Sequence, residues 1–321
     1  MGSIKTVAVL GGSGHLGPTI VHELVAAGFI VTGIMRDTYP SRISFWPDRV
    51  TIKKVHYNLL HELEAAFQGQ DAVVSVLART AYDEQINAIN AAVAAGVKRF
   101  IPSEYSVINL HKPPSGPGPA LSAWKIHEML DGKIKTIEHL EHTVQAAKDF
   151  TWTALSTGLI FDRVGGLSSA GDSGLGFISL RTKQAFVIDS GNEKFHVSTL
   201  AQVGRAVVGV LNHPERTANK YLSTASFNVS RIELIALVEE VTRTKIAIRR
   251  ISWWEMEAAG FVQASTVSHM SAFGIFLSVY TSQDGVGNAL SEEESANSLL
   301  GLPYEDLRSS VVSWLRREGA L

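Results

Sequence analysis

The chain has 321 residues, 45% of them apolar and 19% charged, which is the composition of an ordinary globular protein. Its 29 basic residues nearly balance 31 acidic ones. The chain therefore lacks the excess of positive charge that is typical of nucleic-acid-binding proteins, and we expect no nucleic-acid partner. The absence of cysteine excludes disulfides, thiolate metal sites and cysteine nucleophiles. Lys5 interrupts the N-terminal apolar stretch and no later stretch is long enough to cross a bilayer, so we expect a cytoplasmic protein without signal peptide or membrane segment.

Short apolar segments alternate with helical ones along the first half of the chain. The segments that predict strands are 6–10, 29–35, 50–57, 71–77, 99–102 and 150–157. The segments between them that predict helices are 18–27, 60–67, 84–95 and 124–147, the last with an interruption at Asp131-Gly132. Further on, the pattern predicts helices at 199–211, 232–241 and 306–317 and a strand at 221–226. This alternation is typical of an α/β fold with a doubly wound parallel sheet.

A glycine-rich loop stands between the first expected strand and the first expected helix. It satisfies G-x-G-x-x-G through Gly12, Gly14 and Gly17, and G-x-x-G-x-x-G through Gly11, Gly14 and Gly17. In such a loop one glycine permits the tight turn, one lets the backbone approach a pyrophosphate, and one packs the helix against the strand. We therefore predict a Rossmann-type dinucleotide site. Its loop residues are Gly11, Gly12, Ser13, Gly14, His15, Leu16 and Gly17.

The end of the second strand indicates which dinucleotide is bound. NADP sites bring an arginine to the 2′-phosphate, and Arg36 stands near that position. Arg42 follows as either a phosphate contact or a solvated loop cation. Asp37 keeps NAD open, because an acidic side chain at this place holds the ribose 2′-hydroxyl in NAD sites. We predict NADPH, with Arg36 and Arg42 among its contacts.

Three further segments complete a pattern with the glycine loop and Arg36. They are the run 97–105, which ends Pro-Ser-Glu-Tyr, the Phe-Thr-Trp-Thr stretch within 150–158, and the segment 302–307. Together these features resemble the NmrA-like and isoflavone reductase-like family of atypical short-chain dehydrogenases, and most of all its fungal members. The resemblance implies a Rossmann domain in 1–160 and a smaller C-terminal α+β substrate-binding lobe in 161–321, with 192–229 returning to pack on the Rossmann domain.

The expected catalytic group is a lysine in place of the tyrosine that ordinary short-chain dehydrogenases use. No Tyr-x-x-x-Lys pair occurs, so the acid of ordinary short-chain dehydrogenases is absent. The resemblance implies a lysine on the helix after the Pro-Ser-Glu loop, which is Lys133, or Lys135 in the alternative register. A buried lysine has a lowered pKa and can exchange a proton near neutral pH. The family often has arginine four residues later, where this chain has Ile137.

Two residues of the same loop complete the predicted site. Ser103 is expected beside the cofactor, at the end of the fifth strand. Tyr105 is either a contact to the substrate oxygen or an aromatic packing residue. The histidines show no metal-binding spacing, so we expect no metal.

We therefore expect an NADPH-dependent reductase that acts on a small aromatic or polyketide-like natural product. A lysine would assist hydride transfer to a conjugated carbonyl, a quinone methide or a ketone. Two alternatives stay open: a dinucleotide-binding redox sensor without turnover, and a non-redox isomerase or cyclase of the same fold. The expected partner is an aromatic small molecule, and the expected assembly is a monomer or a homodimer.

Overall fold

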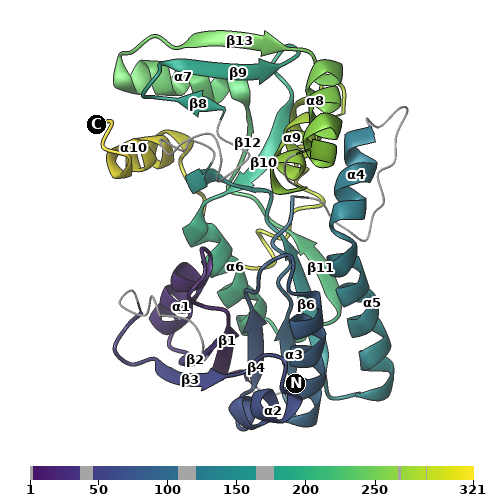
Figure 1. The fold of residues 1–321 in the computed structure, drawn as a ribbon. Helices are drawn as coiled ribbons and strands as arrows, with labels where there is room; N and C mark the ends of the chain where they lie inside the picture. Colours follow the sequence, from purple (N-terminus) through teal and green to yellow (C-terminus); the bar gives the residue numbers. More distant parts are fainter. Residues whose placement is uncertain (1–2, 37–45, 108–120, 164–176, 267–268, 287) are drawn as a thin grey trace.

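The structure is a computed structural model that describes the chain except residues 1–2, 37–45, 108–120, 164–176, 267–268 and 287. In this described part, a seven-stranded parallel sheet has the order β11-β6-β5-β4-β1-β2-β3 (Figure 1). Its strands are β1 Thr6–Leu10, β2 Ile30–Arg36, β3 Thr51–Val55, β4 Ala72–Ser75, β5 Arg99–Ile101, β6 Thr151–Ser156 and β11 Lys220–Ser223. The doubly wound α/β fold predicted from the sequence is confirmed.

Helices cover both faces of this sheet because its strands are apolar on both faces. Val7 and Val9 of β1 face one layer of helices, whereas Ala8 and Leu10 face the other. The first layer is α1 Gly17–Ala26 and α6 Leu200–Asn212; the second is α2 Leu60–Phe67, α3 Tyr82–Ala94 and α5 Asp131–Ala146 (Figure 1).

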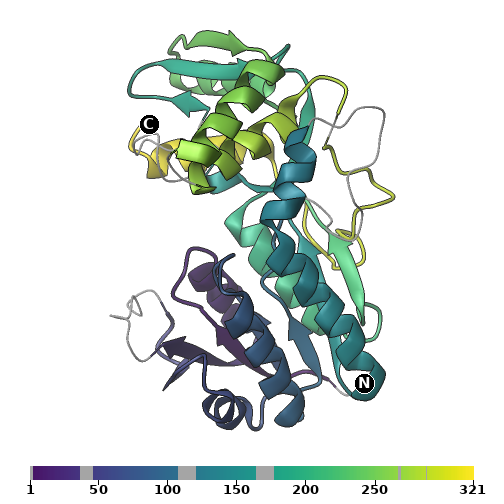
Figure 2. The ribbon, with the colours of Figure 1, turned by 45° about the vertical axis from the view of Figure 1, so that its right-hand side comes forward.

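The predicted helix at 124–147 is two helices, α4 Leu121–Met129 and α5, which are separated at Leu130. The break therefore comes one residue before the predicted interruption, because Asp131 is already the first residue of α5. An acidic side chain suits that position at a helix N-terminus. Figure 2 shows α4 continuing from α5 into the upper part of the molecule.

The upper part of the molecule, called here the upper lobe, contains two three-stranded sheets of order β12-β10-β7 and β13-β9-β8 in the described residues. Their strands are β7 Leu159–Ile160, β8 Ile178–Ser179, β9 Gln184–Ile188, β10 Lys194–Ser198, β12 Phe227–Ser230 and β13 Ala247–Ile251. The helices around them are α7 Arg231–Thr242, α8 Trp253–Thr266, α9 His269–Ser282 and α10 Leu307–Arg317. None of the described helices is long and apolar enough to cross a bilayer.

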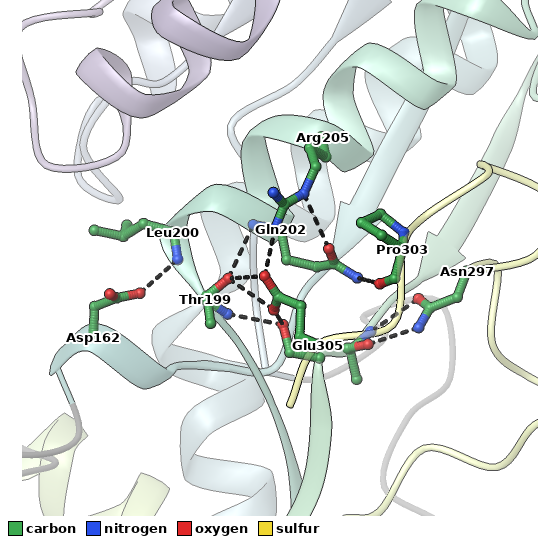
Figure 3. Close-up of polar contacts among 10 residues, drawn as sticks. Asp162, Thr199, Leu200, Gln202, Arg205, Asn297, Pro303 and Glu305 are labelled. Atoms are coloured by element: carbon green, nitrogen blue, oxygen red, sulfur yellow. Dashed lines mark hydrogen bonds and ion pairs between the residues drawn. The ribbon is translucent and has the colours of Figure 1, made fainter. Parts of the chain in front are cut away.

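The C-terminal segment before α10 returns to the N-terminus of α6 (Figure 3). Thr199, the N-cap of α6, donates from Oγ1 to Glu305 Oε2 at 2.9 Å, and Arg205 also pairs with the Glu305 carboxylate. Asp162 accepts a hydrogen bond from the Leu200 backbone N–H at 2.6 Å. Two carboxylates therefore lie at the positive end of this helix, where they stabilise its free N–H groups.

Candidate cofactor and active site

The glycine loop connects β1 to α1 at the C-terminal edge of the sheet. Gly11 has φ +79°, a left-handed conformation that favours glycine. A Cβ on Gly17 would lie 2.1 Å from the Gly12 carbonyl oxygen, so only glycine lets the helix pack this closely on the loop. A Cβ on Gly14 would meet no protein atom closer than 3.4 Å, and Gly14 is exposed. The space beside Gly14 is therefore open to a ligand.

The N-terminus of α1 is suited to an anion. Its N-cap residue, Leu16, offers no side-chain cap, and the first turn holds no acidic residue. The free N–H groups and the helix dipole therefore remain available for a phosphate. Ser13 is half-buried and His15 is exposed on the same loop. These residues fit the pyrophosphate of a dinucleotide at the point where strand order reverses between β1 and β4.

Trp46 supports the loop from inside the fold, a contact that the sequence analysis missed. Its indole Nε1 donates to the Gly12 carbonyl at 3.2 Å, and the residue is buried. A Cβ on Gly33 of β2 would lie 2.0 Å from the indole ring, so Gly33 makes room for it. The sequence signal that could have predicted this contact was a tryptophan in the connection between two strands, together with a glycine inside a strand.

Arg36 ends β2 beside this loop. Its guanidinium carbon lies 5.3 Å from the centre of the Tyr57 ring, and Tyr57 donates its hydroxyl to the Ile34 carbonyl at 2.8 Å. Arg36 Nη2 lies 3.9 Å from Glu84 Oε1, and the Arg36 side chain is 39% exposed. A positioned cation at this place fits a 2′-phosphate. Arg42 and Asp37 lie outside the described residues.

Lys133 lies in the first turn of α5 and reaches the turn that follows β5. Its Nζ donates to the Ser103 carbonyl at 2.6 Å and to the Glu104 carbonyl. Burial lowers the pKa of Lys133. Lys135, in contrast, is 54% exposed and pairs with Asp131 at 2.7 Å. The structure therefore places Lys133 and not Lys135 at this edge of the sheet.

Ser103 and Tyr105 lie on the same turn as these two carbonyls. Ser103 donates its hydroxyl to the Leu77 carbonyl at 2.7 Å, which joins the ends of β4 and β5. Tyr105 has φ 37°, and its buried hydroxyl has no hydrogen-bond partner in the described part of the chain. A small cavity adjoins this turn. The residues that line it are Ala78, Arg79, Ala81, Tyr82, Gln85, Ser103, Glu104, Gly132, Lys133 and Thr136.

Glu104 is a further residue of this turn whose environment the sequence analysis missed. It is 1% exposed, and burial raises its pKa to about 7 despite the nearby Lys133 amine. The hydroxyl of Tyr221, on β11, donates to Glu104 Oε2 at 3.2 Å. The sequence signal that could have indicated a buried Glu104 was its place in the Pro-Ser-Glu-Tyr run, directly after a buried strand.

Comparisons with known proteins agree with this arrangement. Oxidoreductase aprR of Aspergillus flavus is 29% identical over 318 residues, covering 97% of this chain and 98% of that protein. Oxidoreductase poxI of Penicillium oxalicum is 32% identical over 244 residues, covering 75% and 71%. The solved structure of AtPrR2 with NADP+ and (+)pinoresinol superposes with a TM-score of 0.77 at 21% identity, covering 98% of this chain and 100% of that one.

The NmrA-like family matches residues 3–274, which include the glycine loop, Arg36, the turn after β5 and Lys133. The resemblance inferred from the sequence is therefore confirmed, and the chain belongs to the NmrA-like family.

Proposed function

We propose that this chain is an NADPH-dependent reductase of a small aromatic or polyketide-like molecule that carries a conjugated carbonyl, quinone methide or ketone. One observation carries the proposal. The amine of Lys133, on α5, is hydrogen-bonded to the turn that follows β5, at the C-terminal edge of the sheet. Ligands of open parallel sheets bind at this edge. The oxidoreductase relatives in Aspergillus and Penicillium, and the NADP+ complex of AtPrR2, support the assignment.

The cofactor would be held by the glycine loop and Arg36. Backbone N–H groups of residues 11–17 would bind the pyrophosphate, and Arg36 would pair with the 2′-phosphate. Arg42, outside the described residues, is proposed as a second phosphate contact, and Ser103 as a cofactor neighbour at the end of β5. When bound, NADPH supplies the hydride.

Lys133 would supply the proton that accompanies this hydride. An ammonium group has three N–H donors, and the carbonyls of Ser103 and Glu104 occupy two of them. Among the described residues the third donor has no partner, so it would be available to a substrate oxygen. Because burial lowers the pKa of Lys133, the amine can release and regain a proton more readily than an exposed lysine. Tyr105, with its unpartnered hydroxyl among the described residues, is the proposed second contact to that oxygen.

The upper lobe would provide the remainder of the substrate site. We assign residues 1–160 to the cofactor domain and 161–321 to the substrate-binding lobe, with 192–229 returning to the cofactor domain. The parallel pairing of β11 with β6 and the packing of α6 beside α1 support that return. The upper lobe, which lies beyond this edge of the sheet, would exclude water from the reacting groups (Figure 1).

The test is a substrate screen combined with lysine variants. Purified protein is offered NADPH with panels of quinones, enones and aromatic ketones, and both NADPH oxidation and product are followed. With a verified substrate, Lys133→Ala should keep NADPH affinity and lose about 10²–10⁴-fold in turnover. Lys133→Arg should not restore it, because guanidinium does not readily release its proton.

Lys135→Ala is the matched control, since it removes an exposed lysine from the same helix and should keep full turnover. Wild-type turnover in Lys133→Ala would contradict the proposed role of Lys133. Product without NADPH oxidation would identify an isomerase or cyclase. Dinucleotide-dependent binding of a purified partner protein, without turnover of any compound, would identify a sensor.

A further inference from the structure

The carboxyl group of Glu104 is buried but only half satisfied. Its Oε2 accepts a hydrogen bond from the Tyr221 hydroxyl at 3.2 Å, whereas Oε1 has no partner among the described residues. Glu104 is 1% exposed. Most buried polar side-chain atoms have at least one hydrogen-bond partner, because an unsatisfied buried acceptor is costly. The unsatisfied oxygen therefore points to a functional reason for burying a carboxyl group here.

In the described part of the chain, Glu104 interacts with three titratable groups, those of Lys133, Tyr221 and Tyr105, while a further cation, Arg79, acts on Lys133. Lys133, on α5, donates from Nζ to the backbone carbonyl of Glu104, lines the same small cavity as Glu104, and favours ionisation of the carboxyl. Arg79, after β4, lines that cavity too and disfavours the charge on Lys133. Tyr221 approaches from β11, and Tyr105 is the next residue along the chain. Lys133 thus shares one small cavity with a second cation, Arg79, and with one carboxyl group, that of Glu104.

We propose that Glu104 is a positioning residue: its carboxylate is the counter-charge that keeps the Lys133 amine protonated beside the substrate, and Tyr221 holds that carboxylate in place. This inference rests on the proposed function, in which Lys133 gives a proton to the substrate. It adds the group that makes the proton available, since neither of the carbonyls that bind Lys133 carries a full charge.

The physical basis is the cost of a buried ammonium group. Burial favours the neutral amine, and the positive charge of Arg79 adds to that preference. The Glu104 carboxylate opposes both effects, because opposite charges stabilise each other strongly where water is excluded. Loss of the carboxylate should therefore lower the pKa of Lys133. The amine would lose its proton at a lower pH, and the alkaline limb of the turnover profile would move to lower pH.

The experiment measures the charge of Lys133 directly. Lysine side chains are labelled with ¹³C at Cε, and the Lys133 signal is identified by its absence from Lys133→Ala. Glu104→Gln should shift the Lys133 titration to lower pH by about one unit or more. Glu104→Asp, which keeps the charge, should recover most of that shift. Tyr221→Phe should give a smaller shift in the same direction, because it weakens the ionised form of Glu104.

Glu257→Gln is the control for loss of a buried carboxylate elsewhere. Glu257 accepts from the Ser122 backbone N–H at 2.7 Å and its hydroxyl at 2.8 Å, and the variant should leave the Lys133 titration unchanged. An unchanged Lys133 titration in Glu104→Gln would overturn the inference. Should that variant not fold, an unchanged titration in Tyr221→Phe would overturn it. A shifted titration together with wild-type turnover in Lys133→Ala would uphold the charge pairing and refute the proposed function instead.

Discussion

The guanidinium of Arg36 and the carboxylate of Glu84 lie 3.9 Å apart, one at the end of β2 and the other in the first turn of α3. The same guanidinium lies over the Tyr57 ring, so it is held in place before any ligand arrives. A 2′-phosphate would meet a positioned cation that is partly neutralised by an acidic neighbour. This pairing gives two separate expectations for cofactor binding.

Arg36→Ala should remove most of the preference for NADPH over NADH. A charge-assisted contact to a phosphate contributes roughly 1.5–3 kcal/mol, so wild-type protein should prefer NADPH by more than about tenfold. Fluorescence titration of both cofactors measures this ratio, and NADH affinity serves as the internal control because NADH lacks the 2′-phosphate. Equal affinities in the wild-type protein would refute the role assigned to Arg36.

Glu84→Gln should act in the opposite direction and strengthen NADPH binding. Its carboxylate competes for Arg36 and repels the phosphate, and a partly exposed ion pair contributes about 0.2–1 kcal/mol. We therefore expect NADPH affinity to rise by up to about fivefold, with little change for NADH. Asp83→Asn is the matched control, since it removes an exposed negative charge from the same helical turn. A similar gain in both variants would indicate a general charge effect instead.

Two glycines of the same loop should respond differently to substitution. Gly14→Val should fold normally and lose NADPH binding, because no protein atom lies within 3.4 Å of the new Cβ and the side chain enters the proposed phosphate space. Gly17→Ala should instead lower the stability of the protein, since its Cβ would lie 2.1 Å from the Gly12 carbonyl oxygen. Thermal unfolding and NADPH titration of both variants distinguish the two roles. Unchanged NADPH affinity in folded Gly14→Val would leave the loop with a structural role only.

Local sequence patterns were sufficient for the seven-stranded sheet and the glycine loop. Strands of three to seven residues with apolar runs, separated by helical periodicity, carry a clear signal. The strands of the upper lobe gave no comparable signal. Its strands include β7 and β8, of two residues each, and β13, in which four of five residues are exposed. Such segments are paired by tertiary contacts, which no periodicity in the chain reports.

The candidate site also contains one feature that was predicted from the sequence and one that was not. The family resemblance implied Lys133, with Lys135 as the alternative, and the structure distinguishes the two by the direction each side chain takes from the helix. The contact between Glu104 and Tyr221 joins residues 117 positions apart. It depends on β11 being added beside β6, at the edge of the sheet, after the chain has passed through the upper lobe. Sequence alone therefore predicted the residues of the candidate site but missed the contact between Glu104 and Tyr221.

The contact between Glu305 and the N-terminus of α6 should stabilise the whole fold, because it ties the C-terminal segment to a buried helix (Figure 3). The Glu305 side chain is 14% exposed and accepts from Thr199, Ser226 and Arg205. Hydrogen bonds to a charged group contribute about 1.5–3 kcal/mol, so Glu305→Ala should lower the free energy of unfolding by at least that amount.

Urea unfolding at neutral pH measures this loss, and an unchanged slope with denaturant would show that the variant still unfolds from the same compact state. Glu240→Ala is the control, because it removes an ion pair with Arg308 of 2.7 Å that lies on the surface, with Glu240 62% exposed. Surface pairs are screened by water and salt, so this variant should lose much less stability. Equal losses in the two variants would mean that Glu305 acts only as another surface charge, and that apolar packing alone fixes the C-terminal segment.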